Sequence, residues 1–160
     1  MTIVVITASV NTVVMLEFAS DDLLRLVDND VDVVLPYPMP YEPNIHAHHE
    51  RYIKENDWDV LLKALDELEP EYSECFEEVL NQQYLYNYNV LLAKKSVLRS
   101  YCEWLFPILM RTEELTDGKN RSDRYIGYMA ETLETLYFMK NSDKFGGKLN
   151  VVHTLCRLYT

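Results

Sequence analysis

Four prolines fall within the eight residues from Pro36 to Pro43, in the stretch PYPMPYEPN, and they constrain the fold of this chain strongly. Proline has no backbone N–H donor and its ring fixes φ, so this stretch can form neither a helix nor a central strand. We expect an extended loop, which separates a strand-rich beginning of the chain from a longer, mostly helical part.

The residues before this loop are typical of buried strands. Apolar, largely β-branched runs predict strands at 3–6, at 12–16 and, within VDVVLP, at about 31–35. Between them, the segment 20–27 begins with a serine followed by two aspartates, an N-cap pattern that predicts a short helix.

After the loop, apolar residues recur at helical spacing. The pattern predicts a helical stretch over about 47–81 that is divided at Pro70, a residue typical of the first helical turn. Two further long helices are expected: 96–115, with Ser96 as N-cap and a bend or break at Pro107, and 124–139. The expected buried faces are Leu61, Leu62, Leu65 and Leu68, then Tyr72, Cys75, Phe76, Val79 and Leu80, then Tyr101, Trp104, Leu105 and Ile108.

Two shorter elements complete the pattern. YLYNYNVLLAKK reads as one strand with Val90, Leu91 and Leu92 at its core, and 149–158 is typical of a terminal strand or helix. The order of strands and helices indicates an α/β fold, in which a small, mostly buried sheet packs with several long helices. We expect a single domain over residues 1–160.

Composition limits the classes of partner. The formal net charge of −11 argues against binding to nucleic acid and to anionic membranes. Cys75, Cys102 and Cys156 are few and widely spaced, which favours reduced thiols in the cytoplasm. The apolar N-terminus has no basic region and is too short and too polar for a membrane anchor, so we expect no transmembrane segment.

Three of the four histidines crowd into IHAHHE, at His46, His48 and His49. A zinc site needs further ligands that the surrounding sequence does not offer, so polar residues at the start of a helix are the better interpretation. Because the stretch follows the carboxyl end of the VDVVLP strand, however, it is better viewed as a pocket-rim loop whose neutral imidazoles hydrogen-bond a sugar, with His49 as the foremost candidate.

The acids of LVDNDVDVV form two overlapping D-x-D units, at Asp28, Asp30 and Asp32. In open α/β sheets, ligands gather at the carboxyl ends of strands, whereas these acids precede a strand. They are therefore interpreted as a solvated turn rather than as a cation site.

Two later segments offer candidate chemistry. Asn89 is a polar residue at the start of an apparently buried strand, where it needs a partner or a role. In RYIGYMAETLETLYFM, Arg124 and Glu131 are two helical turns apart on roughly one face, and Gly127 lies between them. Arg124 is suited to hold a phosphate, and Glu131 to act as a base or to accept a sugar hydroxyl. A solvated pair of surface charges is the alternative.

These segments resemble a known family. NVLLA (89–93), YCEWLFPIL (101–109) and RYIGYMAETL (124–133) are similar in order and spacing to motifs of the bacterial capsular-polysaccharide-biosynthesis glycosyltransferase-like family, a domain of unknown function. The resemblance covers about residues 20–140 and corresponds to the C-terminal portion of such an enzyme. Residues 1–19, a strand-like start, lie outside it, and Val90 and Thr132 depart from the usual motif.

The resemblance implies a glycosyltransferase that moves a hexose from a nucleotide diphospho-sugar to a surface or capsular glycan. It implies Glu131 as the catalytic residue and a donor-associated divalent cation, Mn or Mg, with no metal site of the protein's own. The resemblance and residue positions together suggest substrate contacts from Arg124, Asn89, Tyr88 and His49. The alternative is a non-catalytic module that binds a glycan or pairs with another chain, including a second copy of itself.

Overall fold

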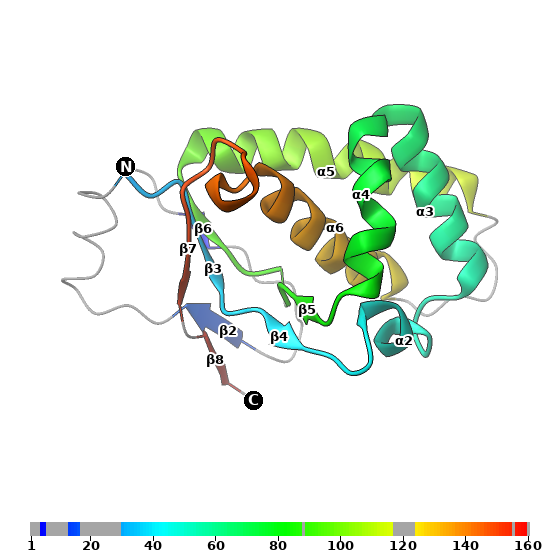
Figure 1. Cartoon of the computed structure of the whole chain (residues 1–160), viewed down its shortest axis with the longest axis horizontal. Coiled ribbons are helices and arrows are strands. Elements are labelled where there is room, and N and C mark those ends of the chain that lie inside the picture. Colours follow the sequence, from blue (N-terminus) through cyan, green and yellow to red (C-terminus); the bar gives the residue numbers. More distant parts are fainter. Residues whose placement is uncertain are drawn as a thin grey trace.

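The computed structural model describes residues 4–5, 13–16, 30–87, 89–116, 124–154 and 156–159, with side chains only from residue 30 to residue 154. The expected helix at 20–27, the acid Asp28, the candidate Tyr88 and the loop at 117–123 lie outside the described residues. Within these limits the fold is α/β, a small sheet with long helices, as the sequence predicts (Figure 1).

The main sheet is built from strands that are far apart in the chain. Its order is β1-β6-β3-β7, in which β3 pairs parallel with β7 and antiparallel with β6. β1 adds to the far side of β6 in antiparallel register. The four strands are β1 (Val4–Val5), β6 (Leu92–Ala93), β3 (Val33–Pro36) and β7 (Val151–Thr154).

Two small antiparallel pairs accompany this sheet. β2 (Val13–Leu16) pairs with β8 (Cys156–Tyr159), and β4 (Met39–Pro40) pairs with β5 (Tyr84–Leu85). The strands expected at 3–6, 12–16 and 31–35 are thus confirmed to within a few residues. β4 lies inside the proline-rich loop, which is extended as predicted, and its two residues are exposed because prolines are tolerated only at the edge of a sheet.

The helices follow the expected order and pack beside the sheet (Figure 1). Pro70 begins a helix as predicted, and α5 continues through Pro107 without a break. The helices are α2 (Ile45–His49), α3 (Glu55–Leu68), α4 (Pro70–Asn81), α5 (Lys95–Leu115), α6 (Tyr125–Asn141) and the 3₁₀ turn η1 (Asp143–Phe145).

Three local predictions were wrong. Ser96 is not the N-cap of α5: Lys94 takes that position and no side chain caps the helix. The single strand expected over 84–95 is broken into β5 and β6, and between them Asn89 has a φ of 49°, a left-handed conformation that Asn tolerates better than most residues. Leu62 and Leu68 are 36% and 43% exposed, because α3 is covered by neighbours on one side only.

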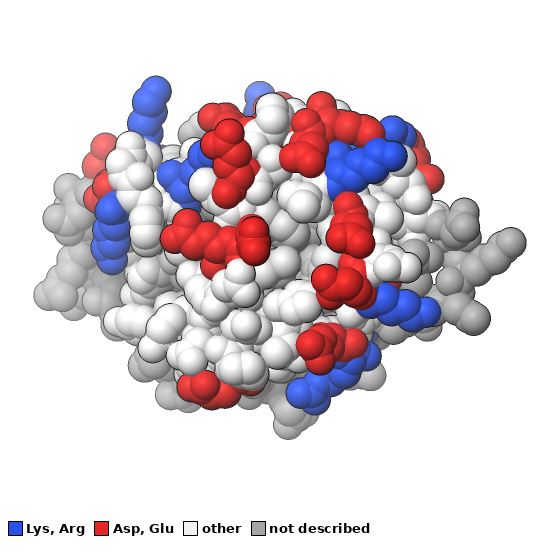
Figure 2. Space-filling view, turned by 45° about the vertical axis from the view of Figure 1, so that its right-hand side comes forward, with Lys and Arg blue, Asp and Glu red and all other residues white. Residues whose placement is uncertain are grey.

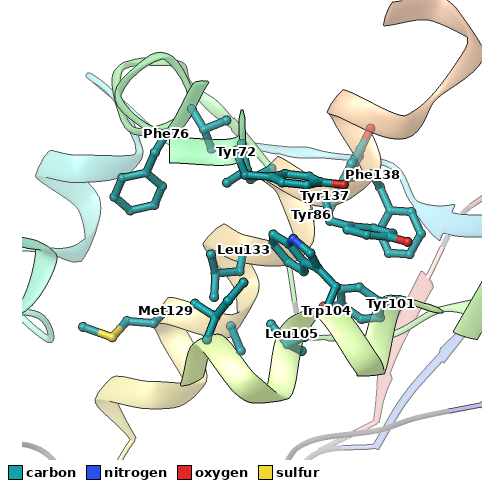
Figure 3. Close-up of a cluster of buried hydrophobic side chains, with 14 of the residues drawn as sticks. Tyr72, Phe76, Tyr86, Tyr101, Trp104, Leu105, Met129, Leu133, Tyr137 and Phe138 are labelled. Carbon is teal, nitrogen blue, oxygen red and sulfur yellow. The ribbon is translucent and has the colours of Figure 1, made fainter. Parts of the chain in front are cut away.

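The centre of the core is α6. Every residue from Met129 to Phe138 is buried, so this central part of the helix is enclosed on all sides, which requires its polar side chains to find partners or remain uncharged. Thr135 accepts a hydrogen bond from Tyr86 N (2.9 Å), which joins the end of β5 to the helix. Figure 3 shows aromatic rings from α4, α5 and α6 packed together, among them Tyr72, Trp104, Tyr137 and Phe138.

The acids at residues 30 and 32 bind Lys94 rather than project freely. The Lys94 ammonium lies 2.9 Å from an Asp32 oxygen and 2.5 Å from an Asp30 oxygen, while Asn150 N donates to the other Asp32 oxygen at 2.9 Å. Burial alone would raise the pKa of Asp32, but these hydrogen bonds outweigh it and lower the pKa. Asp32 and Lys94 therefore join the segments that carry β3, β6 and β7, whereas Asp30, although bound to Lys94, has a largely solvent-exposed side chain.

Candidate functional site

Three predicted site residues gather around one tyrosine at the start of α6. Tyr128 follows Arg124 by four residues and precedes Glu131 by three, so the three share one helix face. The Arg124 guanidinium carbon lies 5.6 Å from the centre of the Tyr128 ring, and the His49 ring lies 5.7 Å from the same centre. His49 thus reaches this group from α2.

A second arginine and tyrosine complete the group. Tyr52 stacks on Tyr128 with ring centres 4.3 Å apart and an angle of 19°, and Arg51 lies 5.5 Å from the Tyr52 ring centre. We call Tyr52 and Tyr128 the tyrosine pair. The result is two stacked rings flanked by two exposed guanidinium groups, in a protein whose net charge is −11. Arginine recognises phosphate by paired hydrogen bonds, and aromatic faces stack on bases.

The sequence analysis missed Arg51, Tyr52 and Tyr128. The adjacent letters ERY after the histidine cluster carry no motif, and Tyr128 is one tyrosine among twelve. Their significance arises only from the stacking of two rings that are remote in the chain.

His49 occupies the core rather than the expected pocket rim. It is 1% exposed and lies 6.0 Å from Trp58, centre to centre. Burial, followed by the neighbouring His48 and His46, lowers the pKa of His49 to about 4, so its ring is neutral at physiological pH. Asn44, which accepts a hydrogen bond from Ala47 N (2.8 Å), caps α2, the helix that carries His49.

Glu131 is accompanied by a second buried acid, Glu134, that the sequence analysis did not single out. Glu131 is 8% exposed and Glu134 is 1% exposed. Neither carboxyl oxygen of Glu134 has a hydrogen-bond partner in the structure. Burial, and then the negative charge of Glu131 one turn away, raise the pKa of Glu134 well above its usual range. Glu134 is therefore an uncharged acid beside Glu131.

The apolar letters around Glu134 are the signal that could have revealed it. In ETLETLYFM, apolar or weakly polar residues occupy all helical faces, so no solvated face remains for this acid. Glu134 also contributes to raising the pKa of Tyr86, which burial and this acid bring to about 12. The two acids and Tyr86 thus form one low-polarity environment.

Replacing Glu134 by Gln is expected to stabilise the protein near neutral pH. The pKa of Glu134 is higher in the folded chain than in the unfolded chain, where it is about 4.3. The contribution of Glu134 to the free energy of unfolding is therefore fully present below about pH 4 and is lost as the pH rises. Gln has no proton to lose, so we expect roughly 1–3 kcal/mol more stability at pH 7–8 and little difference at pH 4.

Urea unfolding of both proteins from pH 4 to pH 8 measures this effect. Glu74→Gln, which changes an exposed acid on α4, is the matched control and should show no such pH dependence. An equal effect of Glu134→Gln at every pH would show that the carboxyl is not held neutral by folding.

Asn89 is the remaining predicted site residue that the structure describes. Asn89 is half-buried between β5 and β6, and no contact described for it joins it to Arg124 or Glu131. Tyr88 is outside the described residues. Gly127 is exposed, and a Cβ added to it would meet no atom within 4 Å, so close packing does not explain this glycine.

The described residues hold neither a grouped metal-ligand set nor a membrane-spanning helix. Among them, no three or more His, Cys, Asp or Glu side chains are grouped so as to hold a metal ion. In the same part of the chain, no helix combines the length and the apolar character that crossing a bilayer requires.

Comparison with known proteins connects this geometry to a family. The family described as "Domain of unknown function (DUF4422)" matches residues 8–142. Among solved structures, the apo structure of the bifunctional glycosyltransferase WbbM is similar, with a TM-score of 0.73 and 26% identity over 86% of this chain. The chain spans about a quarter of that protein, since the match covers 25% of it. No curated protein matches. The protein is thus glycosyltransferase-like in structure, and it belongs to the DUF4422 family.

Proposed function

We propose that the protein is a cytoplasmic bacterial glycosyltransferase that moves a hexose from a nucleotide diphospho-sugar to a surface or capsular polysaccharide. The similarity to WbbM is the observation that carries this proposal, because it extends over 86% of the chain at 26% identity. The local arrangement around the tyrosine pair supports it independently.

The donor diphosphate is assigned to Arg51 and Arg124. Both guanidinium groups lie on exposed side chains beside the tyrosine pair, where they can form charge-assisted hydrogen bonds with phosphate oxygens. The exposed part of the tyrosine pair offers a surface for a base or a sugar ring. A Mn or Mg ion would accompany the diphosphate, which itself supplies oxygen ligands to such ions.

Glu131 is assigned the catalytic role in this proposal. A carboxylate that is 8% exposed and three residues from Tyr128 can accept the proton of an acceptor hydroxyl at the edge of the donor site. The uncharged Glu134, one helical turn further along α6, places no second negative charge beside Glu131. Asn89 and Tyr88 remain proposed substrate contacts, and His49 is a support for Tyr128.

A non-catalytic module is the second candidate. Phe106 and Met110 lie one turn apart on α5 and are 54% and 63% exposed, which is typical of a surface that contacts another protein. Since the chain spans about a quarter of WbbM, a partner chain or a second copy would complete an active enzyme in this case.

Donor binding is expected to raise the melting temperature. Nucleoside diphospho-hexoses, tested one by one with and without Mn²⁺, should stabilise the protein by about 2.7 kcal/mol at one hundred times Kd. The double change Arg51→Gln and Arg124→Gln should remove the shift, because it removes both phosphate-binding groups. Arg99→Gln, an exposed arginine on α5, is the matched control.

The same measurement separates the two candidates. A shift that the double variant loses and Arg99→Gln retains supports donor binding at the tyrosine pair. If no nucleotide sugar shifts the melting temperature, and Met110→Asp disrupts a self-associated form of the protein, the non-catalytic module is correct.

A further inference from the structure

A cavity lies between α2, α3 and α4, and its lining does not include the arginines or the tyrosine pair. Its volume is about 260 Å³, at the small end of ligand pockets and suited to one sugar ring rather than to a nucleotide sugar. We call it the α3–α4 cavity. It is lined by His46, Glu55, Trp58, Asp59, Leu62, Phe76, Glu77, Leu80 and Asn81.

The lining combines aromatic and hydrogen-bonding groups. Trp58 and Phe76 contribute largely buried rings, 5.9 Å apart at their centres, to which the apolar face of a sugar ring can pack. The Trp58 indole nitrogen is buried and has no hydrogen-bond partner in the structure. The carboxylates of Asp59 and Glu77 are acceptors for sugar hydroxyl groups.

The charge of the cavity selects against the donor. Three carboxylates line it, and the one imidazole, His46, is already within 2.9 Å of an oxygen of Glu55. Exposed acids also cover the surrounding helices, and Figure 2 shows acidic side chains gathered on the face that this view brings forward. A diphosphate would be repelled here, whereas an uncharged polyol would not.

The cavity is close to the candidate site. The Trp58 ring lies 6.4 Å from His46 and 6.0 Å from His49, and His49 lies 5.7 Å from Tyr128. Two rings therefore separate the α3–α4 cavity from the tyrosine pair. Because His49 is itself buried, a glycan held in the cavity would have to extend over the protein surface to reach the site assigned to the donor.

We propose that the α3–α4 cavity binds one neutral hexose unit of the acceptor glycan. The assignment to an acceptor rests on the proposed function, whereas sugar binding in the cavity does not. The ligand is thus an uncharged sugar ring, which contacts the aromatic rings through its apolar face and the carboxylates through its hydroxyl groups.

Filling the cavity tests this proposal. Methyl glycosides of glucose, galactose and mannose are titrated by saturation-transfer NMR, and at least one is expected to bind. Leu62 lines the cavity and is 36% exposed, so Leu62→Trp occupies it without opening the core, and should weaken binding at least fivefold. Leu68→Trp places the same side chain on α3 outside the lining, at a leucine that is 43% exposed, and should not weaken binding.

A second variant, Asp59→Ala, and the donor-binding measurement distinguish the remaining outcomes. Asp59→Ala should weaken the same glycoside without changing the melting temperature, because Asp59 is exposed on α3. Donor binding without any glycoside binding overturns this inference and leaves the proposed function standing. Glycoside binding that Leu62→Trp abolishes, with no donor binding, supports the cavity and contradicts the enzyme. Equal binding by both tryptophan variants places the sugar elsewhere and overturns the inference.

Discussion

Replacing Glu131 by Gln is expected to lower the rate of hexose transfer by about 10²–10⁴-fold, the usual contribution of a positioned general base. Gln keeps the size and the hydrogen-bonding shape of the side chain but cannot accept a proton at neutral pH. Because Glu131 is 8% exposed and lies on a buried helix, the substitution leaves the surface groups at Arg51 and Arg124 unchanged. The melting-temperature shift caused by the donor should therefore persist.

Steady-state kinetics distinguish the two roles assigned to Glu131. A base lost from the transition state lowers kcat and leaves the KM for acceptor nearly unchanged, whereas a lost contact to an acceptor hydroxyl raises that KM. Glu113→Gln, an exposed acid on α5, is the control and should retain activity. Full transfer activity of Glu131→Gln, with folding intact, would remove Glu131 from the mechanism.

Replacing Phe138 by Ala is expected to destabilise the protein by about 3–5 kcal/mol. Phe138 is 0% exposed on α6 and packs 5.0 Å from Tyr101 and 5.1 Å from Tyr137, ring centre to ring centre (Figure 3). Its removal leaves a cavity inside the aromatic cluster that the enclosed helix cannot collapse to fill. A loss of this size corresponds to a fall in melting temperature of roughly 6–20 °C for a chain of this length.

Phe106→Ala provides a matched measurement on the same residue type. Phe106 is 54% exposed on α5, so its removal should change the free energy of unfolding by about 0.5 kcal/mol or less. Urea unfolding followed by tryptophan fluorescence reports both values, since Trp104 lies beside the aromatic cluster. Similar values for Phe138→Ala and Phe106→Ala would contradict the enclosed position of α6.

Periodicity and proline placement made much of the fold predictable. The three early strands, the extended proline-rich loop, the helix start at Pro70 and the long last helix depend on local chemistry, which neighbouring letters express directly. Failures occurred where local and tertiary preferences compete. The N-cap position of α5 is occupied by Lys94 and not by Ser96. The strand predicted around Asn89 is interrupted because this residue adopts a left-handed conformation between β5 and β6.

Only part of the candidate site could be predicted from the sequence. Spacing on a helix placed Arg124 and Glu131 on one face, because seven residues are close to two turns. Spacing could not show that Tyr52 stacks on Tyr128 from another part of the chain, or that His49 is buried in the core. Contacts of that kind depend on how α2 packs against α6.

The sequence by itself thus determined the class of fold, the order of its elements and the family resemblance, since each is encoded in local periodicity and in motifs. The tertiary structure decided which acidic side chains are uncharged and which remote residues are in contact. It encloses the central part of α6 on all sides, so that Glu134 is neutral beside Glu131. It also stacks Tyr52 on Tyr128, with an arginine beside each ring. The physical reason is that desolvation and ring stacking depend on neighbours in space, which letters adjacent in the chain do not specify.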